Sequence, residues 1–402
     1  MVKELYQIKT KELTLNITNG EIDSVRKKSL TKSGCRVYDN GCIGIEGVLG
    51  EPTQETWEKA ERALAMNIPY PYEPSKNLVK SRTIGVFVDE KEFITKSEQL
   101  LKTLCEEFPE FVFSNKIEAG EEITILKNDA GLDLCDKQSY VSVGIIVKEK
   151  SSPNVFDSVI QFTDRAFDYE AVLEGARNLL RAHLTPVELP QEKIPVLFGS
   201  YTVSSILGDY LHAQKLKKGA SLLSGKENTK VFSEKLTLSV DRGDESYVSF
   251  FDAEGTIVPN EKLPLIKKGV LLRGVADKLC AEEFGIELTS SAYGGYDDVP
   301  MLAVHPFTLD VDSEGTLKEI LNGRDAIYVC MASGGDITPA GDYATPVQAA
   351  YLCRDGKLVG KLPELNVRGN IFDMLGKDYL GTSSDKPFDM QKLTALYCTV
   401  EA

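Results

Sequence analysis

From Ile194 onward, the chain consists mostly of short runs of strand-forming residues separated by glycine-containing turns. Apolar residues show a clear helical spacing in only two stretches of this half, 202–219 and 313–323. Examples of the turns are Asp252–Gly255, Lys268–Gly269, Arg354–Gly356 and Arg368–Asn370. Glycine is common in such turns because it adopts positive φ without a steric cost. The pattern therefore predicts a β-rich C-terminal domain, residues 191–402.

The first 190 residues combine strand and helix patterns. Residues 4–50 look like strands, and residues 13–29 alternate apolar and polar side chains around Asn19-Gly20, a dipeptide typical of a tight β-hairpin. A helix is expected from Thr53 to about Met66, and the proline-rich stretch 67–77 follows as a linker. Further strands then lie between two expected helices, 90–109 and 168–184. We therefore predict an α+β fold with two N-terminal α/β pieces, an α/β domain at 1–75 and an α+β domain at 76–190, before the β-rich domain.

The composition narrows the range of partners and compartments. The formal net charge of −15 disfavours direct binding to nucleic acid or to an anionic membrane surface. We expect no membrane span, because no segment reaches 18 apolar residues, and no signal peptide precedes the first strand. The eight cysteines form no C-x-x-C pair, as is common for reduced thiols in the cytoplasm. The chain is therefore predicted to be a cytoplasmic protein.

One helical stretch carries the candidate metal ligands. In TVSSILGDYLHAQKLKKG, residues 202–219, Val203, Leu207 and Leu211 lie on one apolar face of the expected helix. Asp209 and His212 lie outside that face, and an Asp and a His three residues apart more often form a surface hydrogen bond than a metal site. Transition metals usually require several nearby imidazole or thiolate ligands. We predict no intact metal site and no cofactor, with Asp209 and His212 as the candidates for a degenerate site.

Several stretches resemble one protein family. Residues 249–271 contain an acidic turn, a glycine and a strand leading into Gly-Val-Leu. Residues 341–381 contain a Gly-Asp-Tyr-Ala turn, an Asp-Gly-Lys hairpin and an Arg-Gly-Asn turn, in that order. This order resembles the TldD/PmbA family, also called the TldD/TldE peptidases and once labelled modulators of DNA gyrase. The stretch 19–47 is similar to the first domain of that family, so the resemblance covers nearly the whole chain.

The resemblance implies a zinc peptidase activity for the family, and this chain departs from the residue pattern that the activity requires. TldD-type members are zinc peptidases with His-Glu-x-x-x-His on a helix and a cysteine ligand near the C-terminus. If His212 takes the place of the second histidine, Leu207 and Gly208 stand where the first histidine and the glutamate belong. Neither residue can bind a metal or accept a proton from water. Cys398, in LYCTVEA, has the context of a strand and not of a glycine-rich ligand loop.

The resemblance therefore implies a TldE-like subunit. Such a chain would be non-catalytic and would pair with a TldD-type catalytic subunit, or with itself as a homodimer, in a cytoplasmic zinc metallopeptidase that acts on unfolded peptides. Two alternatives stay open. The chain could be a metallopeptidase with atypical ligands, for example Asp209, His212 and His305, or a non-enzymatic binding or modulator protein. Whether the chain is itself an enzyme is left undecided by the sequence.

Overall fold

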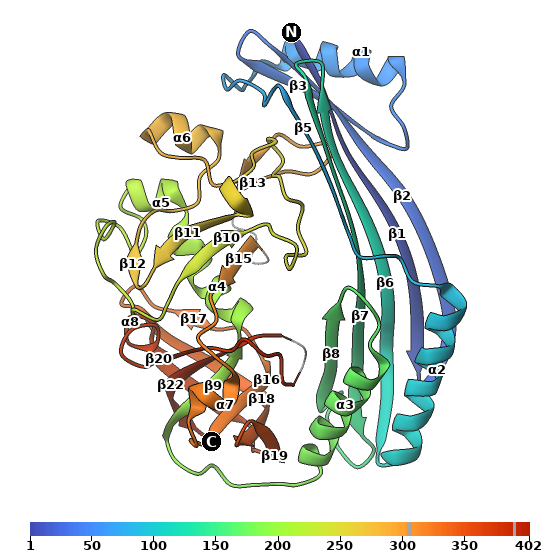
Figure 1. Cartoon of the computed structure of the whole chain (residues 1–402), viewed down its shortest axis with the longest axis vertical. Helices are drawn as coiled ribbons and strands as arrows, with labels where there is room; N and C mark the ends of the chain where they lie inside the picture. Colours follow the sequence, from blue (N-terminus) through green and yellow to red (C-terminus); the bar gives the residue numbers. More distant parts are fainter. Residues whose placement is uncertain (304–307, 389–390) are drawn as a thin grey trace.

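A computed structural model of the chain describes residues 1–303, 308–388 and 391–402. Helices and strands form two regions, which we call the N-terminal region (residues 1–183) and the C-terminal region (residues 193–402). Figure 1 shows the N-terminal region as a tall sheet of long strands, with the C-terminal region along one side of it. The mixed helix and strand content and the β-rich C-terminal region confirm the predicted fold class.

One eight-stranded sheet dominates the N-terminal region. The strand order is β4-β3-β2-β1-β6-β7-β5, with β8 also paired to β7. The strands are β1 (Val2–Thr18), β2 (Glu21–Asp39), β3 (Cys42–Leu49), β4 (Ile68–Pro69), β5 (Leu78–Ile84), β6 (Phe111–Asn128), β7 (Leu132–Glu149) and β8 (Ser158–Asp164). Asn19 and Gly20 form the β1–β2 turn with positive φ, as the sequence predicts. Strands from both sides of residue 75 belong to this sheet, and the division of residues 1–190 into two domains stays a prediction.

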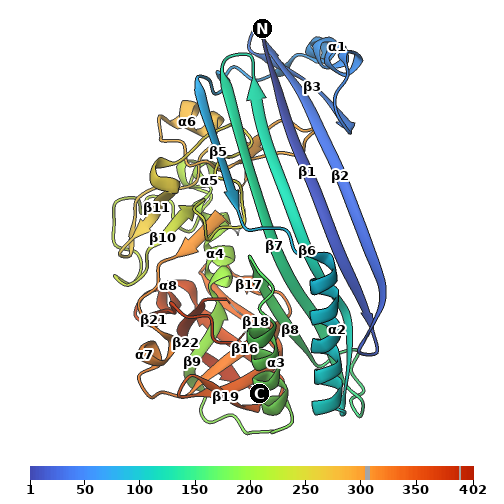
Figure 2. The same cartoon turned by 45° about the vertical axis from the view of Figure 1, so that its right-hand side comes forward.

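The two faces of the long strands contact different neighbours, because successive side chains of a strand point to opposite faces. Leu13, Leu15 and Ile17 of β1 pack with the apolar residues of α2 (Glu90–Glu107) and α3 (Tyr169–His183). On the other face, Tyr6 packs with Phe250 and Phe251 of the C-terminal region. Figure 2 shows α2 and α3 against the lower part of the long strands. The short helix α1 (Gln54–Ala63) packs on β2 and β3.

The C-terminal region contains a ring of strands. Its larger sheet has the order β16-β9-β22-β20-β18-β17, and a further pairing of β16 with β18 closes the ring. The strands are β9 (Lys193–Gly199), β16 (Ala326–Ala332), β17 (Asp336–Ile337), β18 (Asp342–Arg354), β19 (Lys357–Lys361), β20 (Leu365–Asn370), β21 (Tyr379–Thr382) and β22 (Leu393–Glu401). A second sheet contains β10 (Leu238–Asp241), β11 (Lys262–Lys267), β12 (Val270–Leu271) and β15 (Leu309–Val311), and β13 (Ala292–Tyr293) pairs with β14 (Met301–Leu302).

Short helices connect these strands. They are α4 (Ser200–Gly208), α5 (Ala213–Lys217), α6 (Lys278–Phe284), α7 (Leu317–Leu321) and α8 (Ile371–Met374). Helix α7 lies in the predicted stretch 313–323, whereas α6 was not predicted, because seven residues carry too little periodicity to reveal a helix. Among the described helices, none combines the length and the apolar character needed to cross a membrane.

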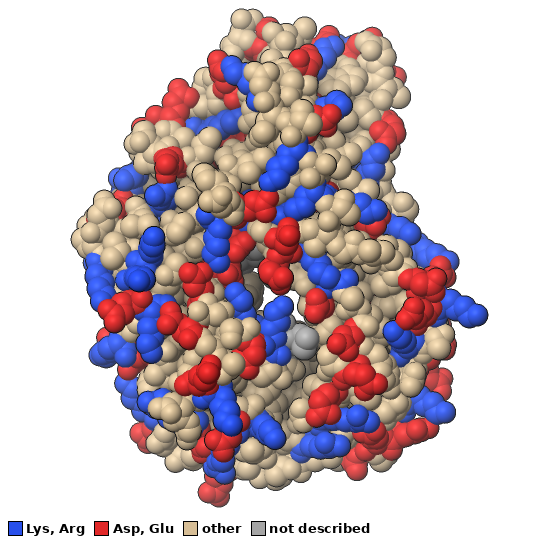
Figure 3. All heavy atoms as spheres, in the orientation of Figure 1, with Lys and Arg blue, Asp and Glu red and all other residues tan. Residues whose placement is uncertain are grey.

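Buried polar contacts join the two regions. Arg82 of β5 makes a bidentate ion pair with Asp136 of β7, at 2.9 Å for each bond, and its side chain also reaches the carbonyl oxygen of Val248. Glu254, which is 4% exposed, accepts a 2.8 Å hydrogen bond from the Tyr70 hydroxyl group and a 3.0 Å bond from the backbone N–H of Lys278. Figure 3 shows a hollow near the middle of the molecule, with acidic and basic side chains around it.

Candidate functional site

The segment with the candidate ligands begins as a helix whose apolar face is fully used for packing. Helix α4 follows β9 directly, and Val203 and Leu207 are both 0% exposed. The hydroxyl group of Ser204 donates a 3.0 Å hydrogen bond to the carbonyl oxygen of Leu309 in β15, which attaches the helix to the second sheet. Leu207 therefore belongs to the hydrophobic core of the C-terminal region.

The backbone leaves the α-helical conformation immediately after this position. Helix α4 ends at Gly208, Asp209–Leu211 forms a single 3₁₀ turn, and His212 is extended at φ −64° and ψ 117°. The interruption has a tertiary cause. Val275 donates its backbone N–H to the Leu211 carbonyl oxygen at 2.7 Å and accepts a bond from Ala213 at 3.1 Å. The prediction of a regular helix through Asp209 and His212 is therefore wrong.

Asp209 and His212 do not form a joint ligand set. The Asp209 side chain is 70% exposed and is ion-paired with Lys215. His212 is partly buried, and its Nδ1 has no hydrogen-bond partner among the described residues. Burial and, to a smaller extent, the nearby Lys215 lower the pKa of His212. This ring is one free nitrogen ligand next to a carboxylate that is already paired with a cation.

The other predicted candidates lie elsewhere. Cys398 is 1% exposed in β22, and burial raises the pKa of its thiol well above the usual range, so it stays protonated and is a poor ligand. His305 lies outside the described residues. Within the described part of the chain, no group of three or more His, Cys, Asp and Glu side chains is arranged to hold a metal ion. If His212 takes the place of the second histidine of the TldD-type motif, Leu207 and Gly208 provide neither a ligand nor a base beside it, and the Cys398 thiol is protonated.

The third histidine, His183, is buried and hydrogen-bonded at both ring nitrogens. His183, at the end of α3, is 3% exposed, with Nδ1 2.9 Å from the Tyr351 hydroxyl group and Nε2 2.9 Å from Nζ of Lys361. Burial and the Lys361 charge lower its pKa to about 4, so the ring is neutral at pH 7. Lys361 lies 178 residues from His183 in the sequence, so no local sequence pattern reveals this contact.

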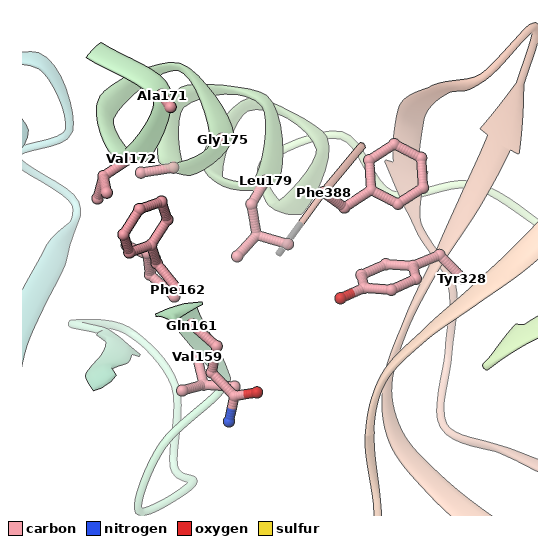
Figure 4. A pocket seen from close by; sticks show the side chains of 11 residues that line it. Val159, Gln161, Phe162, Ala171, Val172, Gly175, Leu179, Tyr328 and Phe388 are labelled. Carbon is pink, nitrogen blue, oxygen red and sulfur yellow. The ribbon is translucent and has the colours of Figure 1, made fainter. Parts of the chain in front are cut away.

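A small cavity between the two regions offers no reactive group. It encloses about 20 Å³ between β8, α3, Tyr328 and Phe388. Figure 4 shows mostly apolar side chains, including Phe162 and Leu179, around it. This space is about that of a single water molecule. We therefore regard the cavity as a packing defect and not as a binding site.

Comparison with known proteins identifies the family. The family model described as PmbA/TldA metallopeptidase C-terminal domain matches residues 191–394. The chain belongs to the PmbA/TldD family. The resemblance seen in stretches 249–271 and 341–381 is thereby confirmed.

Relatives of the PmbA/TldD family match over nearly the whole chain. A protein named metalloprotease from Archaeoglobus fulgidus is 22% identical over 403 aligned positions, covering 94% of this chain and 91% of the relative. The crystal structure of TldE from Thermococcus kodakarensis has a TM-score of 0.79 at 18% identity and covers 100% of this chain and 97% of the other. A Thermotoga maritima protein, described as a putative modulator of a DNA gyrase, has a TM-score of 0.78 at 16% identity and covers 99% and 96%. At these identities the structural matches establish the fold.

Proposed function

We propose that this chain is a non-catalytic, TldE-like subunit of a cytoplasmic peptidase that acts on unfolded peptides, with a TldD-type subunit as its catalytic partner. One observation carries the proposal. If His212 takes the place of the second histidine of the family motif, Leu207 and Gly208 stand at the first histidine and the general base, and Leu207 is packed in the core. A leucine side chain has no lone pair for zinc, and glycine has no group that could take a proton from a bound water.

The backbone supports the same proposal. A metal site built on a helix needs its ligands to point at one ion, and here the helix ends between the two histidine positions. Val275 holds Leu211 and Ala213 on either side of His212, so the extended conformation is part of the fold. In this proposal the catalytic residues are supplied by the TldD-type partner subunit.

A strand edge offers a place for an extended partner segment. Strand β3 pairs with β2 only from Lys32 to Asp39, and within the described residues the part of β2 from Ser24 to Leu30 pairs with β1 alone. An unpaired edge can accept an extended chain by backbone hydrogen bonds. Arg26, Lys27 and Lys28 lie on this edge, and basic residues limit unselective pairing. This edge is one surface on which a partner subunit or a peptide could be held.

The proposal is tested by reconstitution. The isolated chain, a TldD-type subunit containing His-Glu-x-x-x-His, and their mixture are each assayed for cleavage of an unfolded peptide and for sedimentation. We expect no cleavage by the isolated chain, and faster cleavage together with a larger particle in the mixture. Unchanged rates and sedimentation in the mixture would remove the proposal. Chelator-sensitive cleavage by the isolated chain, with stoichiometric zinc, would establish the atypical metallopeptidase instead.

A further inference from the structure

A cavity of about 650 Å³ lies where the end of α3, the segment 184–189 and the end of β19 meet. Figures 1 and 2 show α3 and β19 side by side near the lower end of the molecule. Leu184, Val187 and Leu362 contribute apolar walls, and Glu149, His183 and Lys361 contribute polar groups. Small-molecule sites in proteins have this form, with volumes of about 300–1,000 Å³, apolar walls and a few converging polar groups.

The lysine ammonium group is held in place from inside the protein. Because an ammonium group can only donate hydrogen bonds, Nε2 of His183 accepts from Lys361 at 2.9 Å. The proton of the neutral ring is then on Nδ1, which donates to the Tyr351 hydroxyl oxygen at 2.9 Å. The Tyr351 hydroxyl group is also hydrogen-bonded to Oγ of Ser158 at 2.8 Å. This buried chain uses one N–H of Lys361 and fixes its direction.

A carboxylate and an ammonium group both lie near the same ring nitrogen of His183. Oε2 of Glu149 is 3.8 Å from Nε2 of His183. Lys361 nevertheless forms no ion pair with Glu149 or with any other carboxylate in the described ranges of the chain. Glu188 also lines the cavity and adds a second carboxylate. The lining of the cavity thus includes an ammonium group and carboxylates together with apolar side chains.

We propose that this cavity binds a small zwitterion with an apolar side chain, of the α-amino acid or dipeptide class. The ligand carboxylate contacts Lys361, the ligand ammonium group contacts Glu149, and the apolar side chain lies between Leu184, Val187 and Leu362. Both ligand charges are then satisfied, and the apolar walls are removed from water. The site requires no partner subunit, so it is independent of the proposed peptidase role.

The test is a titration of the full chain by isothermal calorimetry with L-leucine and with Leu-Leu, which separates the two sources of the zwitterion. Two analogues of leucine serve as controls, namely 4-methylpentanoate, which lacks the ammonium group, and 3-methylbutylamine, which lacks the carboxylate. We expect saturable binding of leucine or Leu-Leu and at least tenfold weaker binding of both analogues. No saturable binding of either zwitterion, or equal binding of the analogues, would overturn the proposal.

Variants locate the binding to this cavity. We expect Lys361→Met, which keeps the aliphatic stem, and Glu149→Gln each to weaken binding at least tenfold. Lys357→Met, an exposed lysine on the same strand, should bind like the native chain. Native affinity in both Lys361→Met and Glu149→Gln would overturn the assignment. If Lys361→Met fails to fold, as judged by circular dichroism, Glu149→Gln decides alone. Since these experiments use the isolated chain, their failure leaves the reconstitution test unaffected.

Discussion

Gly34 of β2 lies directly against the backbone of Tyr296, from the C-terminal region. A β-carbon at Gly34 would be 1.6 Å from the carbonyl oxygen of Tyr296. Gly47, the cross-strand partner of Gly34 on β3, meets the same segment, with a β-carbon position 2.4 Å from Cβ of Asp297. Because neither glycine has a side chain, the connection between β13 and β14 packs directly against the sheet at Gly34 and Gly47.

This close packing predicts that one methyl group added at Gly34 strongly lowers the stability of the fold. Gly34→Ala should lower the free energy of unfolding by about 3 kcal/mol, because backbone atoms must move to make room. Gly144→Ala in β7 is the matched control, since its nearest neighbours are 3.6 and 3.9 Å away, and we expect a change below about 1 kcal/mol. Urea unfolding measures both values, and equal stability of the two variants would contradict the contact.

Glu254 predicts a pH dependence of stability. Burial, and secondly Asp252, raise the pKa of Glu254 to about 7 from the usual 4.5. The unfolded chain therefore releases this proton at lower pH than the folded chain. The stabilising contribution is complete below pH 4.5 and is lost as the pH rises to about 7. A rise in pKa of this size corresponds to about 3 kcal/mol.

Glu254→Gln isolates this titration from those of other groups. The amide can accept from the Lys278 N–H and donate to the Tyr70 hydroxyl oxygen, so the contacts are kept without the charge. We expect the native chain to lose stability relative to this variant between pH 4.5 and 7 in urea titrations. A constant difference between the two proteins over that range would show that Glu254 titrates normally.

Metal removal should leave the isolated chain unchanged. The candidate ligand Asp209 is paired with Lys215, and Cys398 is protonated in the core. Of the described candidate ligands only the His212 ring is free, and a single imidazole does not hold zinc against a chelator. Calorimetry should give the same melting temperature with and without EDTA, and elemental analysis should find less than one zinc per chain. One equivalent of zinc that disappears in His212→Ala would contradict this prediction.

Introducing the histidine and glutamate of the family motif at positions 207 and 208 should not give the chain peptidase activity. In Leu207→His/Gly208→Glu, the imidazole replaces a fully buried leucine, so we expect the free energy of unfolding to fall by about 2–5 kcal/mol. His212 would still lie outside the helix, held by the Val275 contacts. Chelator-sensitive hydrolysis of a peptide by this variant would show that the side chains, and not the backbone, limit catalysis.

The local elements were largely predictable, and the helix through the candidate site was the clearest error. Asn19-Gly20 and the helices near α2 and α3 follow from turn chemistry and apolar spacing, which involve residues close together in the chain. The spacing of Val203, Leu207 and Leu211 also predicts a helix, but Val275, more than sixty residues away, replaces the expected helical bonds. Apolar spacing contains no information about such a partner.

The sequence by itself determined that positions 207 and 208 hold Leu207 and Gly208, which cannot act as metal ligands. It also determined the alternation of apolar and polar side chains that divides the long strands into two faces. Only the tertiary structure decided that residues 2–49 and 68–164 share one sheet, that Lys361 meets His183, and that Tyr296 rests on Gly34. The physical reason is the distance along the chain over which each kind of interaction acts. Propensity and side-chain chemistry act within a few residues, whereas pairing and burial depend on the free energy of contacts across the whole chain.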